Sequence, residues 1–178
     1  MMTSLNWFVC VLTAYGLHFG IKYLNSSMNV TMNLLSISEI ISAGLFGVVG
    51  TQFPRKKAYF LSGVMVIICS LITQYLTYIH NGTSLLQWMI SIGIFFTKLF
   101  NGVMFSLVYI VTSELYPTKI RGTMFGVANM LGRMGGLLAP MVIEFEKGYF
   151  LPVFAVATLL SIIGSTFLKE TKGMELSD

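Results

Sequence analysis

Three ionisable residues stand inside long apolar stretches of this sequence: Glu39, Lys98 and Arg133. A charged side chain at bilayer depth costs about 3 kcal/mol or more, so it usually faces a helix-bundle interior or a wet cavity. Lysine and arginine attract anionic groups there, and glutamate attracts an ammonium group or pairs with one of the bases. These residue types therefore predict a binding site for a small charged molecule inside a membrane.

The segment around Arg133 carries a small and polar helical face. Its members recur at spacings of three and four residues, which places them on one side of a helix: Gly122, Gly126, Asn129, Arg133, Gly136 and Pro140. Gly122 with Gly126, and Gly132 with Gly136, have the spacing that lets helices approach closely. One interpretation is a tight helix contact with Arg133 paired internally, for instance to Glu39. The other is a cavity face on which Arg133 attracts an anionic group.

The composition is that of a helical membrane protein. Of the 178 residues, 55% are hydrophobic and only 10% are charged, whereas about a quarter of a soluble domain is charged. No basic run interleaved with aromatic residues suggests a nucleic-acid partner. We expect an integral membrane protein in contact with the lipid bilayer, formed by residues 1–178 without a soluble domain.

A spanning helix needs about 20 predominantly apolar residues, and six segments satisfy that rule. They are Leu5–Leu24, Leu34–Phe53, Ala58–Ile79, Leu85–Leu115, Thr123–Ile143 and Tyr149–Leu168. The first lacks the basic leader and cleavage pattern of a signal peptide, so we interpret it as a retained span.

Lysine and arginine in the short connections set the orientation. The connection at Arg55 and the one at Lys119 and Arg121 are basic, whereas the first and third connections have no such residue. The positive-inside rule then places both termini in the cytoplasm. The glycosylation sequons at Asn25, Asn29 and Asn81 all fall on the predicted outer side.

The six spans divide into two triplets. The third and sixth spans contain no charged residue, so each triplet ends in a helix that we expect to face lipid. This pattern suggests two three-helix repeats of inverted topology, as in many secondary transporters.

A short turn connects the fourth and fifth spans. Pro117 disfavours helix at the preceding residue, so the fourth helix should end near Tyr116. Glu114 and Arg121 flank this turn, and we expect them to pair across it.

At this point a family resemblance appears. Residues 109–140, YIVTSELYPTKIRGTMFGVANMLGRMGGLLAP, resemble the tenth and eleventh helices of the organic cation, anion and carnitine transporters. These transporters form solute carrier family 22 of the major facilitator superfamily. Trp7, Tyr15-Gly16, Glu39, the basic loop at Arg55 and the closing Glu170-Thr171-Lys172-Gly173 follow in the family's order. The resemblance implies the C-terminal six-helix half of a twelve-helix transporter in the plasma membrane.

The resemblance also implies a site and partners. Helices equivalent to the first, second, fourth and fifth spans would line a cavity for a small organic ion. Its expected substrate-binding residues are Arg133, Trp7, Tyr15, Glu39, Lys98, Phe105 and Asn129. Glu114, Arg121, Arg55 and Glu170 would form a cytoplasmic charge clasp. The arginine at position 133 favours an organic anion or a zwitterion such as carnitine over a cation. The opposite wall would come from a missing N-terminal half or a second chain.

The sequence leaves two other classes of function to consider. The six helices could act as a non-transporting structural or regulatory partner of other membrane proteins. An enzyme is poorly supported, because the sequence has no phosphate-binding Gly-Lys-Ser/Thr loop, and His18 and His80 have no metal-ligand or nucleophile partners at useful spacing. We interpret both as interfacial polar residues, and we expect no cofactor and no metal. Cys10 and Cys69 lie in apolar segments and predict no disulfide.

Overall fold

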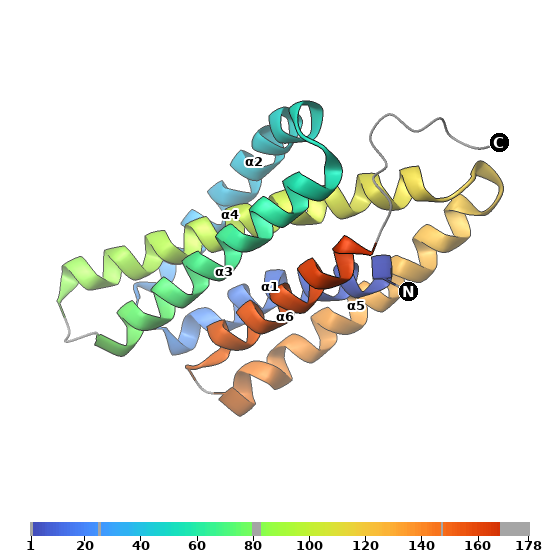
Figure 1. The fold of residues 1–178 in the computed structure, drawn as a ribbon. Helices are drawn as coiled ribbons and strands as arrows, with labels where there is room; N and C mark the ends of the chain where they lie inside the picture. Colours follow the sequence, from blue (N-terminus) through green and yellow to red (C-terminus); the bar gives the residue numbers. More distant parts are fainter. Residues whose placement is uncertain (1, 25, 80–82, 147, 168–178) are drawn as a thin grey trace.

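The computed structural model describes residues 2–24, 26–79, 83–146 and 148–167. These residues form a bundle of long helices joined by short turns (Figure 1). The elements are α1 (Met2–Gly20), the 3₁₀ turn η1 (Ile21–Tyr23), α2 (Met28–Gln52), α3 (Arg55–Ile79), α4 (Ser84–Leu115), α5 (Thr118–Glu146) and α6 (Phe150–Thr166). The predicted all-α class and six-helix order are confirmed.

Local sequence chemistry ends several helices. Phe53 and Tyr116 both have extended backbones and both precede a proline, which disfavours helix at the residue before it. The predicted end of the fourth helix near Tyr116 is therefore confirmed. Gly148, between α5 and α6, has a φ of 105°, a conformation that only glycine adopts without strain.

Five helices, α1 to α5, are long and apolar enough to cross a membrane. The described part of α6 is shorter at 17 residues, and Leu168, the predicted end of the sixth span, lies outside the described residues. α2 begins at Met28 rather than Leu34, so the helix includes polar residues that precede the apolar segment. Among them, the Thr31 hydroxyl donates to the Ser27 carbonyl oxygen at 2.9 Å.

The packing of the helices supports the predicted inverted repeats, α1–α3 and α4–α6. α1 packs on α5 and α6, and correspondingly α4 packs on α2 and α3. If the two repeats are exchanged, α1 takes the place of α4 and α3 takes the place of α6, so the pairs α1–α4 and α3–α6 map onto themselves. Both of these pairs are also in contact. Helices α1 and α4 are therefore the central elements, and α2 and α5 flank them.

Glycines allow α1 to approach its neighbours closely. A Cβ atom on Gly135 of α5 would lie 2.5 Å from the backbone oxygen of Phe8. On the other side of α1, Gly16 and Gly20 receive the rings of Phe154 and Phe150. By contrast, nothing lies within 4 Å of a Cβ added at Gly122 or Gly126, so the close contact predicted for that pair is not made within the described chain.

Buried hydrogen bonds join three helices beside this contact. Ser161 of α6 donates to the Asn6 side-chain oxygen of α1 at 2.9 Å, and its hydroxyl lies 2.6 Å from the Tyr59 hydroxyl of α3. Buried polar groups need such partners, especially in an apolar surrounding. The three helices are thereby fixed in register.

A candidate substrate cavity

A cavity of about 640 Å³ opens between α1, α2 and α4. Ligand pockets for small molecules have volumes of a few hundred to about 1,000 Å³, so an organic ion fits. Its polar and charged lining residues are Tyr15, His18, Glu39, Ser42, Lys98, Asn101 and Ser106, and its apolar ones are Val11, Ala14, Phe19, Ala43, Gly102 and Phe105.

An ion pair lies in this cavity. Lys98 Nζ of α4 is 2.9 Å from Glu39 Oε1 of α2, with side-chain exposures of 6% and 57% respectively. The lysine is therefore held inside the bundle, while its counter-ion remains accessible from the cavity. The base that pairs with Glu39 is therefore Lys98 and not Arg133.

Aromatic rings form the apolar part of the wall. Tyr15 is 53% exposed, and Phe19 is exposed beside it. Phe105 contributes from α4. Flat exposed rings beside charged groups suit amphiphilic organic ions, since they contact apolar bodies and attract cations through their faces.

Trp7 is not part of the cavity surface. It is fully buried, and its Nε1 donates to Thr112 Oγ1 at 2.9 Å. Its ring packs against those of Phe105, Tyr109 and Phe125, with centroids 5.6, 4.3 and 5.3 Å away. Because Phe105 does line the cavity, Trp7 supports that wall from inside the core.

Arg133 and Asn129 lie on α5, outside the lining of this cavity. Arg133 is exposed and Asn129 is half-buried. Gly136, one helical turn beyond Arg133, approaches the Tyr15 ring, because a Cβ there would be 3.2 Å from Tyr15 Cδ2. Arg133 therefore lies on the exposed surface of α5, one helical turn from the position at which α5 approaches Tyr15.

The predicted charge clasp has a different geometry. Arg55 at the start of α3 pairs with Glu114 near the end of α4, with Nη2 3.0 Å from Oε1. Arg55 also donates to the Gly50 carbonyl oxygen. Arg121 instead donates its Nε to the Tyr116 carbonyl oxygen at 3.2 Å. The prediction that Glu114 pairs with Arg121 is thus wrong, because Arg121 turns back onto the chain at its own turn. Glu170 lies outside the described residues.

A third ion pair, which the sequence interpretation missed, lies at the end of the bundle opposite to the Arg55–Glu114 pair. Lys22 Nζ is 2.6 Å from Glu144 Oε1, and both side chains are about half exposed. It joins the end of the α1 segment to the end of α5. The two residues are far apart in sequence, so nothing in the local pattern relates them.

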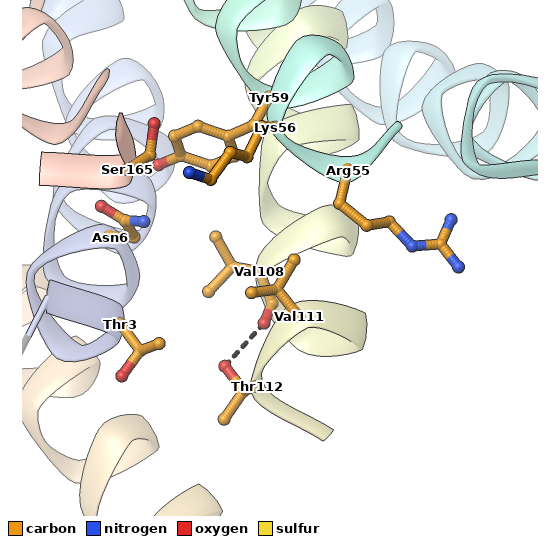
Figure 2. A pocket seen from close by; sticks show the side chains of 9 residues that line it. All are labelled: Thr3, Asn6, Arg55, Lys56, Tyr59, Val108, Val111, Thr112 and Ser165. Carbon is orange, nitrogen blue, oxygen red and sulfur yellow. Dashed lines mark hydrogen bonds between the residues drawn. The ribbon is translucent and has the colours of Figure 1, made fainter. Parts of the chain in front are cut away.

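A much smaller cavity, of about 20 Å³, lies where α1 and α3 begin and α4 and α6 end (Figure 2). Thr3, Asn6, Tyr59, Thr112 and Ser165 contribute its polar groups. Figure 2 shows the Thr112 hydroxyl hydrogen-bonded within its own helix, where it donates to the Val108 oxygen, and the Arg55 guanidinium turned away from this cavity. A volume of this size holds about one water molecule, so it is not a site for an organic ion.

Sequence reasoning missed several cavity residues. His18, Ser42, Asn101 and Ser106 all line it. A signal was present for Asn101, because Lys98, Asn101 and Phe105 recur at helical spacing on one face of α4. Among the described residues, no group of three histidine, cysteine or acidic side chains is arranged to hold a metal ion.

With this geometry in view, comparison with known proteins identifies the class. The family model described as the Major Facilitator Superfamily matches residues 1–173. The chain therefore belongs to the major facilitator superfamily, and its long apolar helices make it an integral membrane protein.

Individual relatives narrow the resemblance to solute carrier family 22. The chain is 28% identical to solute carrier family 22 member 6-A of Xenopus laevis, with 98% of the chain and 31% of the relative covered. It is 29% identical to organic anion transporter 3 of Mus musculus (98% and 32% covered) and 27% identical to organic cation/carnitine transporter 2 of the same species (100% and 31%). The chain thus spans about a third of the length of these relatives. They indicate a transporter family rather than an enzyme family.

Proposed function

We propose that this chain forms one wall of the substrate path of a secondary transporter for small organic ions, and that organic anions or zwitterions such as carnitine are favoured over cations. The observation that carries the proposal is the cavity between α1, α2 and α4, which combines the Glu39–Lys98 pair with the rings of Tyr15 and Phe105. The names of the relatives support this class, since they include an organic anion transporter and an organic cation/carnitine transporter.

The preference for negative charge rests on the balance of charges. Glu39 neutralises Lys98 within the cavity. Arg133 is then the additional positive charge next to the cavity, one helical turn from the point where α5 approaches Tyr15. The excess positive charge attracts a carboxylate, while Glu39 and the exposed aromatic faces accommodate the ammonium group of a zwitterion.

Transport further requires a second unit. The cavity lies beside the weakly buried helices α2 and α5, whose outward surfaces carry large apolar residues such as Ile40 and Leu137. We propose that an N-terminal six-helix half or a second chain covers this side, and that the two units rock about the site in alternating access. The same proposal places the protein in the plasma membrane with both termini in the cytoplasm, and gives it no cofactor, metal or enzymatic activity.

The test is an uptake panel with benzoate, carnitine and tetraethylammonium in cells expressing the protein. We expect uptake of the first two to exceed that of the cation. Arg133→Ala should lower benzoate uptake by roughly tenfold, the loss expected when one charge-assisted interaction of about 1.4 kcal/mol is removed. Lys119→Ala is the matched control, because it removes an exposed base on the same helix beyond the cavity. Unchanged benzoate uptake in Arg133→Ala would remove this residue from the site.

A further inference from the structure

A separate cavity of about 510 Å³ lies where α3 begins and α6 ends, and we call it the α3–α6 cavity. The two helices pack side by side (Figure 1). Lys56 of α3 donates its Nζ to the Thr166 carbonyl oxygen at the end of α6, at 3.0 Å, and Figure 2 shows Lys56 beside Ser165. Among the described residues, this cavity shares no lining residue with the candidate substrate cavity, so the two are distinct.

The charged groups in the described lining of the α3–α6 cavity are both basic: Lys56 and Lys57. Lys56 is held by its bond to Thr166. Lys57 is exposed, and the ion pairs formed within the described ranges do not include it. The Glu114 carboxylate is close in space to the start of α3, but it pairs with Arg55, which does not line this cavity. The Lys57 ammonium group is therefore available to an anionic ligand.

Large apolar side chains form the rest of the cavity. Phe53, Phe60 and Leu61 line it, and each is about half exposed. Phe60 and Leu61 follow Lys57 by three and four residues, so they lie on the same side of α3, about 5 Å further along the helix axis. Beyond the cavity the outward surfaces of both helices continue with exposed apolar residues, namely Ile68 and Leu71 of α3 and Leu160 and Ile163 of α6. The cavity thus has a basic end and an apolar continuation along the helices.

A phospholipid has its groups in the same order, with a headgroup at the membrane surface and acyl chains below it. The basic connection before α3 lies on the side that we assign to the cytoplasm, and the cytoplasmic leaflet is the one that carries anionic lipids. Basic pockets between membrane helices on that side are suited to anionic headgroups. Charge and shape therefore favour the same ligand.

We propose that the α3–α6 cavity binds an anionic phospholipid, with the headgroup at Lys57 and an acyl chain over Phe60 and Leu61. The site faces away from the candidate substrate cavity, and the proposal does not depend on transport. A failure of the proposed function would leave it in place.

Native mass spectrometry of the purified chain in detergent tests the headgroup contact by measuring dissociation constants for dioctanoyl phosphatidylserine and dioctanoyl phosphatidylcholine. We expect the unmodified chain to bind phosphatidylserine several-fold more tightly. Lys57→Gln should weaken that binding about fivefold, the effect of one basic residue at a membrane surface, and Lys57→Arg should retain it. Lys119→Gln is the matched control, because it removes an exposed lysine at the start of α5, outside the cavity. Equal losses in Lys57→Gln and Lys119→Gln, or equal binding of the two lipids by the unmodified chain, would overturn the proposal.

The acyl-chain contact has its own pair of variants. Leu61→Ala should weaken the binding of both lipids by a similar factor, whereas Leu71→Ala, at an exposed position of α3 outside the cavity, should weaken neither. Glycerophosphoserine and inorganic phosphate separate a lipid site from a general anion site, and we expect both to bind much more weakly than the lipid. If either displaces phosphatidylserine at an equal concentration, the cavity takes free anions and the proposal of a lipid site is wrong.

Discussion

At the scale of single residues, the two members of the cavity ion pair have unequal surroundings. Lys98 is almost completely enclosed, whereas more than half of the Glu39 side chain is exposed. Removing one partner of an ion pair is costly when the remaining charge is buried. The two residues should therefore differ in their effect on stability, although they form one contact.

The corresponding prediction concerns thermal stability. Glu39→Met strands the ammonium group of Lys98 in the bundle and should cost about 1–3 kcal/mol, seen as a midpoint roughly 3 °C or more below that of the unmodified protein. Lys98→Met leaves an accessible carboxylate and should cost less. The double variant should be more stable than Glu39→Met alone. Thermal denaturation in detergent measures all three, and equal losses in both single variants would contradict the asymmetry.

At the scale of helices, α1 and α5 approach each other closely where α5 has a glycine and therefore no side chain. Gly135 faces the backbone of α1, which cannot rotate away as a side chain can. Gly126 lies on the same helix but has open space around its Cβ position. One helix thus provides both a test position and its control.

We expect Gly135→Ala to separate α1 from α5 and to cost about 1–3 kcal/mol, the usual cost of overpacking. Gly126→Ala should leave stability unchanged or raise it, because alanine favours helix over glycine by about 1 kcal/mol. The measurement is again the unfolding midpoint. A Gly135→Ala variant as stable as the Gly126→Ala variant would show that the α1–α5 contact is not tight.

Some of this arrangement was predictable from sequence, and some was not. Helix ends were predictable at Pro54 and Pro117, since proline acts on its immediate neighbour. Glu39 and Lys98 were predictable as site residues because charges are rare in spans. The burial of Trp7 was not predictable, since a membrane helix is apolar all round and its pattern does not distinguish core from cavity. The Arg55–Glu114 partnership depends on packing between helices, which local spacing cannot specify.

At the scale of the whole molecule, the helices alternate in direction. Figure 1 shows the connections after α2 and α4 lying toward one end of the bundle, together with the start of α1. The C-terminal ends of α1, α3 and α5 lie toward the other end. This alternation agrees with the alternation of basic connections in the sequence.

The orientation can be tested by cysteine labelling. Both Ser27, before α2, and Lys119, at the start of α5, are exposed. A membrane-impermeant maleimide applied to intact cells should label Ser27→Cys. It should label Lys119→Cys only after permeabilisation. The native Cys10 is buried and Cys69 is partly buried, so background labelling should be low. The reverse pattern would contradict the proposed topology.

The packing of α1 has a consequence for biosynthesis. Its main contacts are with α4, α5 and α6, all of which are made later than α1 itself. Meanwhile its polar residues Thr3 and Asn6 are buried in the finished bundle, where they meet Tyr116, which follows α4, and Ser161 of α6. The polar groups of α1 can therefore form these hydrogen bonds only after α4 to α6 have been synthesised. A nascent chain that stops after α3 would therefore hold α1 without the neighbours that pair with its polar groups.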